Sequence, residues 1–119
     1  MHKWNNQAPT ALLIGRFQPW HDGHQALFEQ ALARAGQVLI AVRDTHGTDD
    51  KNPFDYEFVR SRIVEKLEPN YAGRYWIQLM PNITNFIYGR DVGYQIERVH
   101  LDAQLESISA TQIRRELGA

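Results

Sequence analysis

The spacing of apolar residues changes near the start of the chain, and this change predicts a strand followed by a helix. Residues 11–14 form a continuous apolar run that ends at Gly15, which is typical of a strand in a sheet covered on both faces. From Gln25 to Gly36 the apolar residues instead recur at helical spacing. They are Leu27, Phe28, Ala31, Leu32 and Ala35.

Strand-like and helix-like patterns continue to alternate along the rest of the chain. A second strand is predicted at residues 37–42, and a long polar loop at 43–53 leads to a second helix that is N-capped by Asp55. The expected buried stripe of this helix is Phe58, Val59, Ile63 and Leu67. Three more strands are predicted near residues 75–79, 85–88 and 95–101.

This alternation predicts an α/β fold, with a single Rossmann-like domain whose five-stranded, mainly parallel sheet is flanked by helices. The chain has 119 residues, of which 43% are apolar and 23% are charged, so it has room for one ordinary globular core. We expect the domain to occupy residues 10–119 and residues 1–9 to be a loose leader.

Charge and composition narrow the range of partners. The formal net charge is -1, so there is no overall basic field and we expect no nucleic-acid partner. The sequence has no Cys, which excludes a disulfide framework and a Cys-based zinc site and agrees with a cytoplasmic location. No stretch is long and apolar enough for a membrane span. The oligomeric state stays open, since a homo-oligomer paired through edge strands or helix faces is compatible with so small a domain.

The segment that joins the first strand to the first helix reads Gly-Arg-Phe-Gln-Pro-Trp-His-Asp-Gly-His, and its position suits anion binding. Ligands of open α/β sheets bind at the carboxyl ends of the strands, where a helix N-terminus offers unpaired N–H groups and a positive dipole end. His21 and His24 can both reach one phosphate, and Arg16 adds a planar donor. Gly15 and Gly23 allow a ligand to approach the main chain. Helix capping alone is the alternative for such a histidine pair.

A second candidate phosphate site is predicted near the end of the chain. Ser109 is suited to N-cap a short helix, and Gln112 completes a capping box with it. Thr111 and Arg114 lie on the first turn of that helix, so a hydroxyl, free backbone N–H groups and a guanidinium face the same anion. The alternative is a well-capped terminal helix without a ligand.

Together, the two segments resemble the signatures of the nucleotidyltransferase superfamily, which is also called HIGH-motif or cytidylyltransferase-like. The first signature, His-x-Gly-His, matches residues 21–24, and the second, Ile-Ser-x-Thr-x-x-Arg, matches residues 108–114. The resemblance extends over about residues 11–117. It implies a Rossmann-like domain that transfers a nucleotidyl group from a nucleoside triphosphate to a small phosphate-bearing acceptor and releases pyrophosphate.

The resemblance also implies roles for individual residues. His21 and His24 would stabilise the transition-state charge on the α-phosphate, and Arg114 would hold the β- and γ-phosphates. The other expected nucleotide-binding residues are Gly15, Arg16, Phe17, Gly23, Gly89, Arg90, Asp91, Ile108, Ser109 and Thr111. The expected substrate-binding residues are Trp20, Arg43, Lys51, Arg60 and Arg62. Mg²⁺ would be bound through the triphosphate, so no protein metal site is expected.

Several of these positions have a simpler alternative. Each of the basic residues in the loop after the second strand and in the following helix can be an ordinary surface charge. Asp91 can be a turn former beside Gly89. Trp20 can be a packing residue instead of a ring that stacks on a ligand.

Finer similarities predict the substrate. The extended first segment and residues 51–54, Lys-Asn-Pro-Phe, look most similar to archaeal-type nicotinamide mononucleotide adenylyltransferases, which use ATP. We therefore expect ATP as the nucleotide and nicotinamide mononucleotide as the first candidate acceptor. One alternative is a CTP-dependent cytidylyltransferase acting on a small phosphorylated alcohol or sugar, because the chain is close in length to such enzymes. Another is a non-catalytic nucleotide-binding domain, although the complete signatures argue against it.

Overall fold

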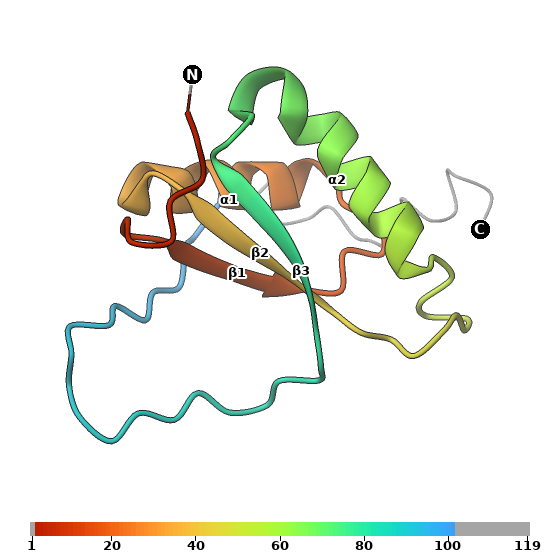
Figure 1. Cartoon of the computed structure of the whole chain (residues 1–119). Coiled ribbons are helices and arrows are strands. Elements are labelled where there is room, and N and C mark those ends of the chain that lie inside the picture. The colour runs from red at the N-terminus through yellow and green to blue at the C-terminus, as the bar shows by residue number, and fades with distance from the viewer. Residues whose placement is uncertain (1, 102–119) are drawn as a thin grey trace.

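The computed structural model describes residues 2–101, and these fold into a three-stranded parallel sheet with two helices. In chain order the elements are β1 (Ala11–Gly15), α1 (Asp22–Ala35), β2 (Val38–Arg43), α2 (Tyr56–Tyr71) and β3 (Tyr75–Met80). The strands lie in the order β1-β2-β3, with Leu13 beside Ile40 and Ile40 beside Ile77. Figure 1 shows the strands side by side with α1 crossing behind them. The predicted α/β, Rossmann-like fold is confirmed over these elements.

Both helices cover the same face of the sheet. The strand order follows the chain order, and right-handed parallel crossovers then place successive helices on one side. One hydrophobic core accordingly joins Leu13 and Ile40 of the sheet to Phe28 of α1 and Ile63 of α2. On the opposite face of the described sheet, the ring of Trp76 is 50% exposed.

The helix ends follow local signals in the sequence. α1 begins after its N-cap, His21, and ends before Gly36, whose φ of 86° is the left-handed conformation that glycine readily adopts at a helix end. α2 begins after Asp55, whose Oδ1 accepts a hydrogen bond of 2.9 Å from the backbone N–H of Phe58. The predicted cap at Asp55 is therefore confirmed. Neither helix is long and apolar enough to cross a membrane, as far as the described residues go.

The predicted fourth and fifth strands, at residues 85–88 and 95–101, are wrong in this structure. Residues 81–101 contain no helix or strand, and Figure 1 shows them leaving β3 as an open excursion. A strand needs a neighbour for its backbone N–H and C=O groups. Ile87, in the middle of the expected fourth strand, is 90% exposed, so this segment has neither a ladder nor a buried face to stabilise a strand.

The buried stripe of α2 is narrower than predicted. Val59, Ile63 and Leu67 are buried, as expected, and their i, i+4 spacing places them on one face of the helix. Phe58 is 41% exposed, so its expected place in the stripe is wrong. Its ring lies to the side of that face and stacks on Phe54, with the ring centroids 4.2 Å apart.

The N-terminal segment is attached to the sheet through Gln37, the residue before β2. The Nε2 of Gln37 donates a hydrogen bond of 2.7 Å to the carbonyl of Asn5, and its Oε1 accepts one of 3.2 Å from the Asn5 N–H. The same Nε2 donates to Oγ1 of Thr10 at 2.6 Å. These contacts hold the described part of the expected leader against the domain.

Replacing Ile63 with Ala will lower the free energy of unfolding by about 2–5 kcal/mol, because the substitution leaves a cavity in the core. Phe58→Ala is the matched control on the same helix, and it costs about 1 kcal/mol because the substitution mainly removes a half-exposed aromatic stack. Urea unfolding of both variants measures the difference. Equal losses would contradict the assignment of the buried face of α2.

Candidate active site

The centre of the candidate site is the N-terminus of α1, where two histidines cap the helix reciprocally. Nδ1 of His21 accepts a hydrogen bond of 3.0 Å from the N–H of Gly23, and Nδ1 of His24 accepts one of 3.1 Å from the N–H of His21. The two imidazole rings stack, with centroids 3.9 Å apart and 26° between their planes. The histidines thus form a capping box. Capping, which the sequence allowed as an alternative, is confirmed, and it brings both rings to one helix N-terminus.

These hydrogen bonds determine where each ring carries its proton. A neutral imidazole has a single N–H, and Nδ1 accepts a hydrogen bond only when it is bare. The proton of His21 and the proton of His24 therefore lie on Nε2. Each ring has one Nε2–H donor that the cap does not use, and the helix N-terminus adds its positive dipole end. This combination favours an anion.

The environment holds both histidines neutral at pH 7. Burial, with a smaller contribution from His21, lowers the pKa of His24 from 6.5 to about 3. Burial also lowers the pKa of His21, a shift that Asp22 opposes and Arg62 reinforces. At this pH the pair therefore consists of two neutral rings, each with an Nε2–H donor.

A buried aromatic cluster supports the two histidines. Phe17 and Trp20 are 3% and 1% exposed, and their ring centroids lie 5.1 Å apart. Their rings also contact His24, at 4.9 Å and 5.6 Å between centroids. The prediction that Trp20 stacks on a ligand is therefore wrong, because its ring belongs to the core. The side chain of Phe17 is likewise a core residue, and the expected nucleotide contact of Phe17 stays a prediction.

Gly15 is required by the close approach of Phe17. A Cβ atom at Gly15 would lie 2.9 Å from the Phe17 ring. Phe17 has a φ of 52°, in the left-handed region that bulky residues rarely adopt. The structure thus gives Gly15 a role in packing. The expected contacts of Gly15 and Gly23 with a nucleotide stay predictions.

Three sets of hydrogen bonds join the turn before α1 to the segment around the start of α2. The guanidinium of Arg16 donates to the side chain of Asn52 at 3.2 Å. The amide of Gln18 bonds the carbonyl and N–H of Phe54 at 2.9 and 3.0 Å. The carbonyl of Trp20 accepts a hydrogen bond of 2.8 Å from Nε of Arg62. Arg62, a predicted substrate contact, therefore lies beside the histidine pair. Sequence reasoning assigned no role to Gln18 or Asn52. No local signal indicates one, because the hydrogen bond that links each of them to the other segment joins residues 36 positions apart in the sequence.

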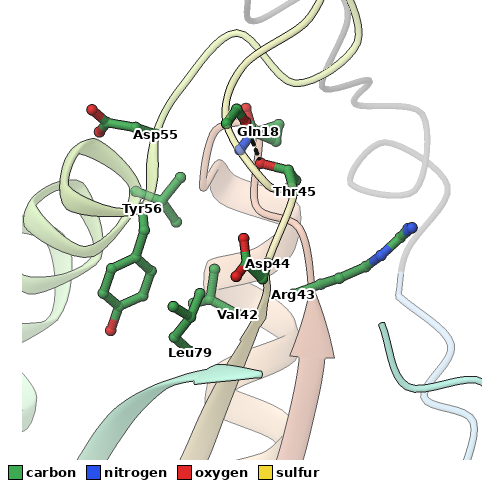
Figure 2. Close-up of a pocket in the computed structure, with 10 residues that line it drawn as sticks. Gln18, Val42, Arg43, Asp44, Thr45, Asp55, Tyr56 and Leu79 are labelled. Atoms are coloured by element: carbon green, nitrogen blue, oxygen red, sulfur yellow. Dashed lines mark hydrogen bonds between the residues drawn. The ribbon is translucent and has the colours of Figure 1, made fainter. Parts of the chain in front are cut away.

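A pocket of about 110 Å³ opens beside this turn, at the carboxyl ends of β2 and β3. Figure 2 shows Asp44 and Thr45 on the loop after β2, with the side chain of Thr45 pointing towards Gln18, and Asp55 and Tyr56 at the start of α2 on the other side of the pocket. Val42 and Leu79 add apolar surface to the lining. The lining combines a few polar groups with apolar surface, as the linings of small-molecule sites do.

The other predicted basic contacts lie at different places. Arg43 ends β2, and in Figure 2 its side chain extends away from the other labelled residues. Lys51 is exposed in the loop before α2. Arg60 is exposed on α2 and lies near enough to Tyr75 to influence the pKa of that phenol. Since Tyr75 begins β3, the structure does not bring Arg60 to the histidine pair at the carboxyl end of the sheet.

The remaining predicted nucleotide contacts are not brought to the site in the described residues. Gly89, Arg90 and Asp91 are exposed in the excursion after β3. Oδ1 of Asp91 accepts a hydrogen bond of 2.9 Å from the N–H of Gly93, so Asp91 forms the turn that was its alternative role. The second motif, with Ile108, Ser109, Thr111 and Arg114, lies outside the described residues.

Comparisons with known proteins find a matching family and related sequences. The chain matches the cytidylyltransferase-like family over residues 12–116. A nicotinamide-nucleotide adenylyltransferase of Pyrococcus horikoshii is 29% identical over 110 residues, which cover 90% of this chain and 59% of that protein. A nicotinamide-nucleotide adenylyltransferase of Thermococcus onnurineus is also 29% identical, over 90% of this chain and 58% of its own length. The chain therefore spans less than two thirds of the length of these relatives.

A solved structure resembles the fold. It is the bifunctional NMN adenylyltransferase/ADP ribose pyrophosphatase of Francisella tularensis in complex with AMP and a manganese ion. The TM-score is 0.55 and the sequence identity is 30%, and the match covers 63% of this chain and 23% of that one.

The neutral state of His24 predicts a pH-dependent stability. Because the unfolded state takes up a proton near pH 6.5 and the folded state only near pH 3, the free energy of unfolding falls as the pH falls between these values. The contribution of one such proton is about 1.4 kcal/mol per pH unit. His24→Asn keeps an acceptor for the N–H of His21 but cannot titrate, so its unfolding free energy will depend less steeply on pH. Urea unfolding at about pH 7, 6, 5 and 4.5 measures how the unfolding free energy of the wild type and of His24→Asn changes with pH. Equal slopes for the two proteins would contradict the lowered pKa.

Proposed function

The chain belongs to the cytidylyltransferase-like family, and we propose that it is a nucleotidyltransferase that moves an adenylyl group from ATP to a small phosphorylated acceptor. Nicotinamide mononucleotide is the acceptor that we propose first, because the two archaeal relatives are nicotinamide-nucleotide adenylyltransferases. The observation that supports the reaction best is the histidine pair, which combines two Nε2–H donors with the N-terminus of α1.

The proposed reaction requires stabilisation of negative charge on the α-phosphate of ATP. An oxygen of the acceptor phosphate attacks the α-phosphorus in line, and the bond from that phosphorus to the oxygen bridging the α- and β-phosphates breaks. Pyrophosphate leaves with the bridging oxygen. The Nε2–H groups of His21 and His24 donate hydrogen bonds to the α-phosphate oxygens and transfer no proton.

Arginines supply the positive charge that the neutral histidines lack. Nε of Arg62 donates to the carbonyl of Trp20, and the charge of Arg62 acts on His21. Arg16 lies at the start of the same turn. We propose that both guanidinium groups contact phosphate oxygens, which they match in geometry. Thr111 and Arg114 of the second motif would hold the β- and γ-phosphates.

The pocket beside the turn is the proposed acceptor site. It lies at the carboxyl end of the sheet, as the histidine pair does, and Gln18 lines it from the turn. Asp44, Thr45 and Tyr56 offer hydrogen-bonding groups for the part of the acceptor that is not its phosphate. The small size of the pocket favours a small acceptor.

Mg²⁺ would enter this site with the triphosphate. Within residues 2–101, no group of three or more His, Asp or Glu side chains is placed to hold a metal ion. These residues therefore form no cage of their own for the ion. Phosphate oxygens are the ligands that we propose for it.

Pyrophosphate release in the presence of Mg²⁺ tests the proposed reaction. ATP and CTP are each combined with nicotinamide mononucleotide, glycerol 3-phosphate, phosphocholine and a sugar phosphate. We expect acceptor-dependent release with ATP and nicotinamide mononucleotide. Release only with CTP would indicate a cytidylyltransferase, and nucleotide binding without release from any pair would indicate a non-catalytic nucleotide-binding domain.

Two substitutions in the same assay separate the capping role of His24 from its proposed donor role. Asparagine places an oxygen near the position of Nδ1, so His24→Asn keeps the cap acceptor and loses the Nε2–H. Glutamine places an amide nitrogen near the position of Nε2, so His24→Gln keeps a donor and loses the cap acceptor. We expect His24→Asn to lower kcat about 10²–10³-fold with a much smaller change in nucleotide Kd, and His24→Gln to keep more activity. A greater loss of kcat in His24→Gln would refute the donor role.

A further inference from the structure

Two glutamines are the buried polar side chains of residues 2–101, and each bonds both backbone groups of one distant residue. Gln18 and Gln37 are each 5% exposed. Nε2 of Gln18 donates to the carbonyl of Phe54 at 2.9 Å, and its Oε1 accepts from the Phe54 N–H at 3.0 Å. Gln37 bonds the carbonyl and N–H of Asn5 in the same way, at 2.7 Å and 3.2 Å. Gln18 lies at the carboxyl end of the sheet, beside the candidate site, whereas Gln37 lies at its amino end.

Phe54 ends the loop of residues 44–54, which contributes to the proposed acceptor pocket. The loop begins after β2, where the N–H of Asp44 donates to the carbonyl of Met80 at 2.6 Å. It returns to the domain at Phe54, whose ring stacks on Phe58. The backbone of Phe54 is held by the amide of Gln18. The pocket wall formed by Asp44 and Thr45 is thus anchored at one end by the sheet and at the other by Gln18.

We propose that Gln18 is a positioning residue, which fixes the loop of residues 44–54 relative to the histidine pair. Gln18 lies three residues before His21 in the same turn, and its side chain also lines the pocket. The hydrogen bond between Arg16 and Asn52 is a second link between turn and loop. Gln18 therefore connects the loop of the proposed acceptor site by hydrogen bonds to the turn that carries the histidine pair of the proposed nucleotide site.

This role acts on the alignment of the acceptor, and it rests on the proposed function. The loop lines the proposed acceptor pocket, so its displacement weakens binding of the acceptor more than binding of ATP. Gln18→Leu keeps a side chain of similar size but leaves the N–H and C=O of Phe54 without the partners that Gln18 supplies. We expect KM for the acceptor to rise about tenfold, and KM for ATP to change less than about twofold, because the histidine pair is capped independently of the loop.

The experiment compares Gln18→Leu with Gln37→Leu in the full chain. Gln37→Leu is the control, because it removes the same pair of backbone hydrogen bonds, together with one to Thr10, from an equally buried glutamine at the other end of the sheet. Amide hydrogen exchange of residues 44–54 is measured without substrate, and KM is measured for nicotinamide mononucleotide and ATP. In Gln18→Leu we expect amide exchange of this loop to be about tenfold faster and the acceptor KM to rise. In Gln37→Leu we expect neither change.

The two readouts distinguish failure of this inference from failure of the proposed function. The positioning role is overturned if residues 44–54 exchange at the same rate in Gln18→Leu and Gln37→Leu. It is also overturned if Gln18→Leu is active and its acceptor KM is unchanged. A wild-type chain without transfer overturns the proposed function, and loop exchange then decides whether Gln18 holds the loop. If Gln18→Leu does not fold, Gln18→Glu replaces it, since it keeps the acceptor for the Phe54 N–H and loses the donor. Smaller changes in the same direction support the proposal, and no change overturns it.

Discussion

The reciprocal capping of α1 by His21 and His24 is the interaction on which the candidate site depends. Each imidazole uses Nδ1 to satisfy a backbone N–H at the helix start, so the proton is confined to Nε2. The same hydrogen bonds therefore stabilise the helix and determine what the site presents to a ligand. Burial against the aromatic cluster keeps His24 neutral, with a pKa of about 3. The reactive end of the helix is in this way part of the core, and it cannot be altered without a cost in stability.

The fold brings two further side chains, Arg62 and Gln18, to this helix end. Because the strands are parallel and ordered β1-β2-β3, the turn before α1 and the loop before α2 both emerge at the carboxyl end of the sheet. Arg62 reaches the turn from α2, and Gln18 reaches the loop from the turn. The turn that carries the histidine pair is consequently connected to the neighbouring loop and to α2 by hydrogen bonds from the side chains of Gln18 and Arg62 to backbone groups.

Local patterns predicted the two helices and the three strands that pair with one another, and they failed for two segments that have no pairing neighbour among the described residues. β1, α1, β2, α2 and β3, together with the cap at Asp55, follow from periodicity and capping signals that operate within a few residues. The strands expected at residues 85–88 and 95–101 depend on pairing with a neighbour that a single segment cannot reveal. The histidine pair was predicted as a site, but the burial of Trp20 follows from contacts with Phe17, His24 and Phe28 that its sequence context did not specify. The bonds of Gln18 join residues 36 positions apart, and no local signal indicates them.

The most direct test of the histidine arrangement is nitrogen-15 NMR of the imidazole rings at pH 7, which distinguishes a bare ring nitrogen from one that carries a proton. We expect both His21 and His24 to be neutral at this pH, with a bare Nδ1 and a protonated Nε2. His24, with a pKa of about 3, should remain neutral at lower pH still. A doubly protonated ring at pH 7, or a proton on Nδ1 of either residue, would contradict the reciprocal cap and the donor role derived from it.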